Sequence, residues 1–110
     1  MSIKDAQVID IHAHAVLEET FGTAGSFGPE LYEEADGTPV YRIGEYRLRN
    51  VRYRGSAFMD PDVRIAAMDR AGIDWQLLSP NPLTYFHYIP AAEAIAFCRR
   101  HNDALAAQVS

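Results

Sequence analysis

His12 and His14 are the two residues of this sequence whose types and spacing most directly suggest chemistry. They lie in an apolar run, residues 8–14, which is typical of a buried β-strand. Alternate side chains of a strand share a face, so both imidazoles project to one side, roughly 6.5–7 Å apart along the strand. Because neutral imidazole is a good ligand for zinc, the spacing predicts a site for one divalent ion, Zn²⁺ first and Mn²⁺ as the alternative.

The residues around the histidines predict their surroundings. Asp10 has the parity of the histidines, whereas Ile9, Ile11 and Ala13 alternate with them on an apolar face. This pattern predicts a strand buried on both faces, where imidazoles are costly unless something pairs with them. Asp10 is a candidate for a carboxylate that hydrogen-bonds to a metal ligand and orients it, or else for a hydrogen-bond acceptor at the end of the strand. The alternative for the histidines is a core pair bonded to the backbone.

Four regions are expected along the 110 residues. The first strand covers residues 7–14, and a long loop rich in glycine and proline covers residues 15–59. A hairpin is possible inside that loop, with residues 39–43 and 46–51 flanking Gly44 and Glu45. A helix begins at Asp60-Pro61 and ends at Gly72, a strand covers residues 73–79, and a helix runs from Pro90 to about Gln108.

This βαβα order predicts an α/β fold with parallel strands and crossover connections. We expect the N-terminal part, about two βα units, of a (β/α)₈ TIM barrel with a long inserted loop after the first strand. Since a complete barrel takes about 250 residues, residues 1–110 are expected to form a partial barrel domain belonging to a larger enzyme.

The composition of the sequence indicates which binding partners and which cellular compartment to expect. The formal net charge of −5 argues against nucleic-acid binding, which needs a basic surface. No apolar run approaches the roughly 20 residues that span a bilayer, so no membrane partner is expected. No signal peptide is visible and Cys98 is the only cysteine, which together predict a cytoplasmic protein. Open strand edges predict a homo-oligomer.

Two motifs carry a resemblance to a known family. The run Val8-Ile9-Asp10-Ile11-His12-Ala13-His14 resembles the first-strand HxH signature of the amidohydrolase superfamily. Residues 60–79, with Met68-Asp69, Gly72, Asp74 and Gln76, are similar to a block of its amidohydrolase 2 branch. That branch includes aminocarboxymuconate-semialdehyde decarboxylase and resorcylate-type decarboxylases. Residues 99–103, with an Asn-Asp pair, also resemble that branch, and the similarity is weakest over residues 15–49.

The resemblance implies a barrel holding one divalent metal, with His12 and His14 as ligands. It implies that a further histidine, an aspartate and the catalytic residues come from beyond residue 110. It also implies that Arg52, eight residues before Asp60, binds a substrate carboxylate. The alternative for Arg52 is a solvated charge in a basic run that also contains Arg47, Arg49 and Arg54.

The expected barrel suggests further candidates, because loops after its strands build the active site. Tyr85 and His87 follow the second strand and are candidates for lining a substrate pocket, the alternative being packing of the loop or a subunit interface. Arg64, Asp69 and Asp74 are expected to be structural ion-pair and capping groups.

The resulting hypothesis is a metal-dependent decarboxylase, a lyase acting on an unsaturated or aromatic carboxylic acid. The same ligands would serve a metal-dependent hydrolase of a lactone, an amide or a carbon–carbon bond. A third possibility is a non-catalytic fragment that associates through its strand edges.

Overall fold

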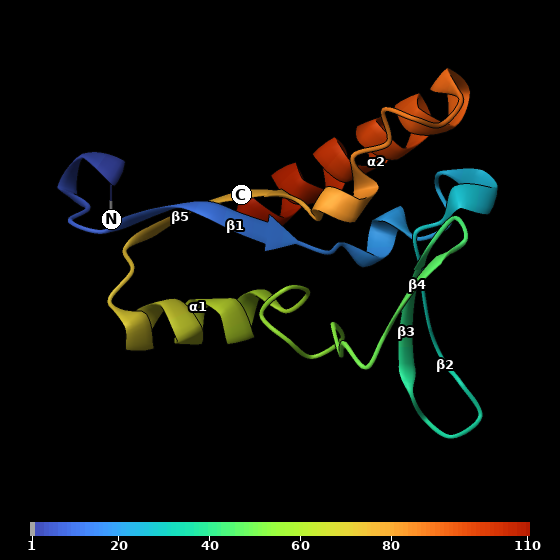
Figure 1. Cartoon of the computed structure of the whole chain (residues 1–110). Coiled ribbons are helices and arrows are strands. Elements are labelled where there is room, and N and C mark those ends of the chain that lie inside the picture. Colours follow the sequence, from blue (N-terminus) through green and yellow to red (C-terminus); the bar gives the residue numbers. More distant parts are fainter. Residues whose placement is uncertain (1) are drawn as a thin grey trace. The chain divides into compact units, whose positions relative to one another are not determined.

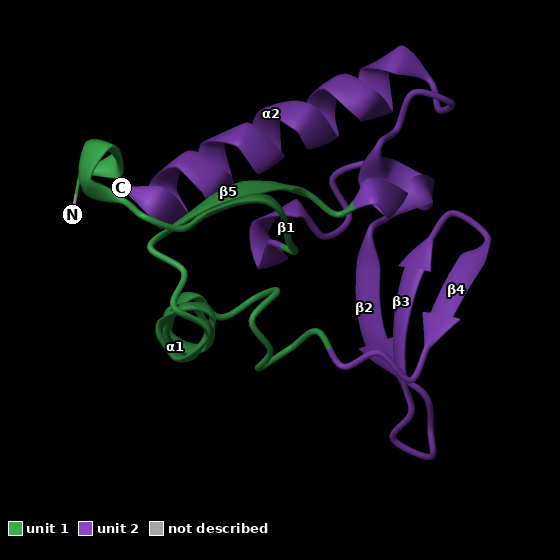
Figure 2. Ribbon diagram, turned by 60° about the vertical axis from the view of Figure 1, so that its left-hand side comes forward, with its two compact units in different colours: residues 1–16, 53–81 green, residues 17–52, 82–110 purple. Residues whose placement is uncertain are grey.

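The computed structural model describes residues 2–110, which divide into two compact units (Figures 1 and 2). Unit 1 comprises residues 2–16 and 53–81, and unit 2 comprises residues 17–52 and 82–110. The chain therefore leaves unit 1 after its first strand and returns to it before its helix. Each unit has its own sheet, with two strands in unit 1 and three in unit 2.

Unit 1 contains a parallel pair of strands, β1 (Ile9–Ala15) and β5 (Trp75–Pro80), the α-helix α1 (Pro61–Ala71) and the short 3₁₀ helix η1 (Ile3–Asp5). Asp10 lies opposite Gln76, but His14 lies opposite Ser79, so the register shifts by one residue between Asp10 and Ala13. The extra residue is a β-bulge in β1, the strand that carries both histidines.

Helix α1 has the ends that the sequence predicts. The side chain of Asp60 accepts hydrogen bonds from the backbone N–H groups of Asp62 and Val63, at 2.9 and 3.4 Å. Pro61 occupies the first turn, and Gly72 ends the helix in the left-handed region with φ of 72°. The expected start and end of this helix are therefore confirmed.

Unit 2 contains an antiparallel sheet in the order β2 (Glu30–Glu33), β3 (Pro39–Ile43) and β4 (Tyr46–Arg49). The central strand provides the core, since Val40 and Tyr41 are 0% and 1% exposed. Exposed arginine and glutamate side chains on neighbouring segments form ion pairs, such as the contact of 2.7 Å between Arg49 and Glu34. The predicted hairpin around Gly44 is confirmed as β3 and β4.

The helix α2 (Ala91–Val109) belongs to unit 2, as do the 3₁₀ helices η2 (Glu18–Thr20), η3 (Gly25–Phe27) and η4 (Pro82–Thr84). It lies against η2, where the guanidinium of Arg100 donates to the backbone oxygen of Glu19. Its buried Phe97 meets the ring of Phe86 edge to face, at 5.0 Å between centroids. The final helix is thus confirmed to within one residue at each end.

The expected TIM-barrel fragment is wrong. Residues 2–110 form a small α/β structure with five strands in two sheets, one a parallel pair and the other antiparallel. The βαβα pattern identified β1, α1, β5 and α2 correctly, but alternation alone does not decide how many strands join one sheet. Three of the five strands instead pair among themselves through short local turns.

The expected long loop over residues 15–59 is also wrong, because this part of the chain contains the strands β2, β3 and β4. Its glycines mark turns between strands: Gly37, with φ of 87°, lies between β2 and β3, and Gly44, with φ of 58°, lies between β3 and β4. Positive φ values of this kind are what tight turns require of glycine. Strand β2 was missed because it is only four residues long and has glutamate at both ends.

The strands of unit 1 are also less buried than expected. Ile11 is 76% exposed and Leu77 is 63% exposed, although both belong to apolar runs. A strand is buried on both faces only when another layer covers each face, and a two-stranded sheet with a single α-helix does not provide this. Among residues 2–110, no helix has the length and apolar character needed to cross a membrane.

The N-cap of α1 provides a test of local stability. Asp60→Ala removes the side-chain acceptor for two backbone N–H groups, and we expect it to lower the free energy of unfolding by about 1 kcal/mol. Asp60→Asn is the matched control, because asparagine caps helices about as well as aspartate. Urea denaturation measures both variants, and equal losses in the two would contradict a capping role.

His101 of α2 provides a test by pH. It is 3% exposed, its ring lies 5.6 Å from that of Phe97, and burial lowers its pKa below 6.5. The unfolded chain therefore binds a proton at a higher pH than the folded chain does. Stability from this group is complete above about pH 6.5 and is lost as the pH falls toward the lower pKa of the folded state.

Urea denaturation between pH 5 and pH 8 measures this effect. On acidification, the free energy of unfolding of His101→Leu should fall less than that of the parent protein, because the variant lacks one histidine that takes up a proton on unfolding. A variant with the same pH dependence as the parent protein would contradict this assignment.

Candidate metal centre

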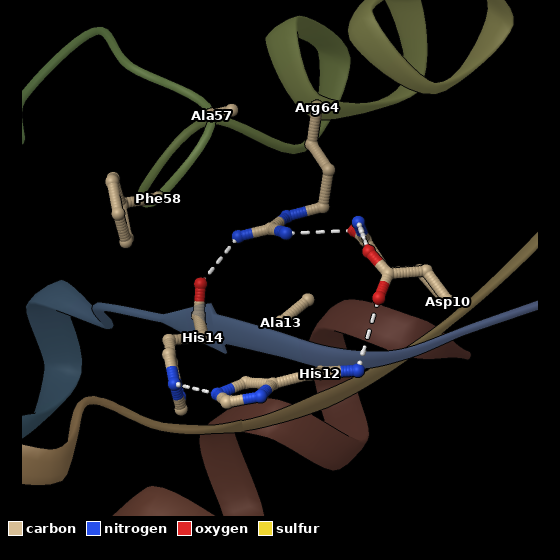
Figure 3. A pocket seen from close by; sticks show the side chains of 8 residues that line it. Asp10, His12, Ala13, His14, Ala57, Phe58 and Arg64 are labelled. Atoms are coloured by element: carbon tan, nitrogen blue, oxygen red, sulfur yellow. Dashed lines mark hydrogen bonds between the residues drawn. The ribbon is translucent and has the colours of Figure 1, made fainter. Parts of the chain in front are cut away.

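The two predicted ligands lie together on β1. The Nε2 atoms of His12 and His14 are 3.0 Å apart, and the ring centroids are 4.9 Å apart with planes nearly perpendicular, at 88°. His12 is exposed and His14 is partly buried. The convergence that the alternating pattern predicts is therefore present in the structure, and both rings turn the same nitrogen toward a common point (Figure 3).

The other nitrogen of His14 determines how that ring is protonated. Its Nδ1 lies 3.0 Å from the backbone oxygen of Pro80, which can only accept, so Nδ1 carries the hydrogen. Ser79 supports this arrangement, since its hydroxyl donates to the Ala13 oxygen and lies 3.1 Å from the same Nδ1. Neutral His14 therefore presents a bare Nε2 lone pair, which is the form that binds metals.

The distance between the two nitrogens fits a shared ion. Two nitrogens bound to one zinc at about 2.0–2.1 Å lie about 2.8–3.4 Å apart for bond angles between roughly 90° and 110°. The observed 3.0 Å lies in this range. Among residues 2–110, however, no group of three or more histidine, cysteine, aspartate or glutamate side chains gathers around one point. The described residues thus supply two imidazole ligands and no complete set.

Asp10 does not lie beside the imidazoles as its parity predicted. Residues paired across β1 and β5 share a face, and Gln76 and Ser79 lie on opposite faces because they are three residues apart. Asp10, opposite Gln76, and His14, opposite Ser79, therefore point to opposite faces. The physical reason is the bulge between them, which reverses the alternation of side chains.

A pocket of about 260 Å³ lies at this part of unit 1 (Figure 3). It is lined by residues of β1, β5, α1 and the segment before α1, namely Asp10, His12, Ala13, His14, Ala57, Phe58, Arg64 and Gln76. The segment that carries Phe58 is tied to the end of β1, because the Val16 N–H donates to the Phe58 oxygen at 2.9 Å. The pocket is thus bordered by the segment that carries both histidines, a charged guanidinium and an aromatic ring.

The pocket's charges are Asp10 and Arg64. The His12 backbone N–H, followed by the amide of Gln76, lowers the pKa of Asp10, so this carboxyl is ionised at neutral pH. Burial lowers the pKa of Arg64, against the opposing effect of the Asp10 charge. Arginine stays protonated even so. The amide of Gln76 lies between the guanidinium and the carboxylate and hydrogen-bonds to both, so these two charged groups do not form a direct ion pair.

The predicted substrate residues belong to unit 2. Arg52 donates to Glu33 at 3.3 Å, and both side chains are 61% exposed. Tyr85 is 46% exposed, and the exposed His87 lies 5.5 Å from the ring of Tyr88. These contacts describe the local surroundings of the three residues, and their substrate roles stay predictions.

Sequence reasoning missed two residues that the structure brings to the histidines. Arg64 was expected to be an ordinary structural group, and Gln76 was only part of a motif, yet both contact the bulge region. The available signal was the strand pairing, because a parallel register places Gln76 beside Asp10. Asp74 has the structural role expected of it, accepting from the Gln7 and Val8 N–H groups ahead of β1.

No known protein-family model matches this sequence. The resemblance to the amidohydrolase superfamily consequently stays a prediction from the motifs around His12, residues 60–79 and residues 99–103.

Proposed function

We propose that His12 and His14 bind one divalent metal ion, Zn²⁺ in the first instance, and that the protein is a metal-dependent decarboxylase of the amidohydrolase type. The observation that carries the proposal is the contact of 3.0 Å between the two Nε2 atoms, with the Nδ1 of His14 held by Pro80. This arrangement leaves two nitrogen lone pairs available at one point once the shared proton is displaced.

In this proposal the substrate is an unsaturated or aromatic carboxylic acid. When bound, a divalent ion would supply Lewis-acid chemistry next to the pocket. Arg64 contributes a positive charge to the pocket wall, and Phe58 contributes an apolar surface suited to an unsaturated or aromatic group. Separately, Arg52 of unit 2 is proposed to bind a carboxylate, because its exposed contact with Glu33 costs little to break.

Hydrolysis is the second candidate, because two imidazoles and a pocket with a positive charge would also suit a lactone, an amide or a carbon–carbon bond next to a carbonyl. A non-catalytic role is the third. The exposed Ile11 and Leu77 favour it, because apolar side chains on a small sheet promote association.

Metal binding is tested first. Isothermal titration of Zn²⁺ at pH 7.5 should show one ion per chain for the parent protein and no measurable binding for His12→Ala or His14→Ala. Each variant leaves a single imidazole, which holds the ion too weakly to measure. His87→Ala is the matched control, because it removes an exposed histidine outside the pair. Unchanged binding by His12→Ala or His14→Ala would refute the site.

The reaction is tested separately. Metal-loaded protein incubated with a panel of unsaturated and aromatic carboxylic acids should release CO₂, and His12→Ala should abolish the release. Arg52→Gln should raise KM about tenfold or more, since a charged hydrogen bond contributes about 1.5–3 kcal/mol. Turnover of a lactone or an amide without CO₂ from any acid would replace the decarboxylase by the hydrolase.

A further inference from the structure

A chain of hydrogen bonds surrounds the bulge in β1. The guanidinium of Arg64 donates through Nη1 to Oε1 of Gln76, at 2.7 Å, and the Nε2 of Gln76 donates to Oδ2 of Asp10, at 2.9 Å. The other carboxylate oxygen of Asp10 accepts from the backbone N–H of His12, at 3.0 Å. Through Nη2, Arg64 also donates to the backbone oxygen of His14, at 2.7 Å.

Every bond in this chain has an obligatory direction. Arginine can only donate, an ionised carboxylate can only accept, and a backbone N–H can only donate. The amide of Gln76 therefore has one workable orientation, with its oxygen toward Arg64 and its nitrogen toward Asp10. Turning the amide over would set donor against donor at Arg64 and acceptor against acceptor at Asp10.

The chain ends on the backbone at both histidines. Its anchors are the N–H of His12 and the C=O of His14, which are separated in sequence only by Ala13. The bonds thus hold the three residues whose path determines where both imidazoles leave the strand (Figure 3). The side chains of Arg64, Gln76 and Asp10 do not bond to a ring nitrogen of the pair, since each bonds to the backbone or to its neighbour among the three.

We propose that Arg64, Gln76 and Asp10 form a directional relay of positioning residues that holds the bulge and so sets the approach of His12 to His14. The consequence for metal affinity rests on the proposed function, whereas the effect on the ring pair does not. Groups that orient metal ligands from behind change affinity by about 10–100-fold when removed. We expect an effect of that size here.

The direction of the bonds allows a test that separates the relay from simple packing. In Asp10→Asn, the side-chain oxygen is needed by the His12 N–H, so the new amide nitrogen faces the amide nitrogen of Gln76. In Gln76→Glu, two carboxylates face each other. In the double variant, the new amide at position 10 donates to the new carboxylate at position 76, and that carboxylate also accepts from Arg64. Every bond of the chain is then restored, with the direction reversed at one link.

Zinc affinity of the full chain, measured by titration, should fall tenfold or more in each single variant and return to within about threefold of the parent protein in the double variant. Asp69→Asn is the control, because it removes the same charge from an exposed position of α1. Circular dichroism confirms that each variant is folded. A double variant that fails to fold, or that binds as weakly as the single variants, overturns the relay, as do single variants that bind like the parent protein.

A second measurement separates failure of the relay from failure of the metal site. In metal-free protein, nuclear Overhauser effects between the two imidazole rings should appear in the parent protein and the double variant and be lost in both single variants. If the parent protein binds no zinc but the ring contacts follow this order, the relay stands and the metal proposal fails. If the ring contacts persist in every variant, the relay is refuted.

Discussion

The β-bulge between Asp10 and Ala13 is the constraint on which the rest of the candidate site depends. One extra residue in β1 takes a backbone N–H out of the ladder with β5, and a backbone donor without an acceptor is costly. The carboxylate of Asp10 supplies the acceptor for the N–H of His12. The bulge also reverses the alternation of side chains, which puts Asp10 and His14 on opposite faces and leaves the imidazoles facing each other.

The two faces of β1 consequently have different chemistry. One face holds ionic and amide groups, with Arg64 and Asp10 joined through Gln76. The other face holds His14, whose Nδ1 is taken by the Pro80 oxygen and whose Nε2 meets that of His12. Arg64 and Asp10 therefore contact the two histidines through backbone atoms and not through the imidazole nitrogens.

In unit 2, strands that are neighbours along the sequence pair with one another in their own sheet. Its three strands are joined by short turns at Gly37 and Gly44, and Val40 and Tyr41 of the central strand form a buried core. Arginines that look in sequence like a basic run lie beside glutamates of neighbouring segments, Arg49 with Glu34 and Arg52 with Glu33. An antiparallel sheet needs only tight turns, whereas parallel strands need long crossovers, so these residues pair locally.

The sequence by itself determined the features that depend on neighbours along the chain. Asp60, Pro61 and Gly72 defined α1, Pro90 began α2 within one residue, Gly44 defined a hairpin, and the spacing of His12 and His14 predicted that the rings converge. Each follows from backbone preferences or from the period of a strand.

Only the tertiary structure decided how strands associate and which side chains meet. It assigned five strands to two sheets, shifted the register inside β1, separated Asp10 from the imidazoles and brought Arg64 and Gln76 to the bulge. The reason is that Gln76 and Asp10 are 66 residues apart in the chain. Contacts at such separation depend on strand register, and a single inserted residue changes every face after it.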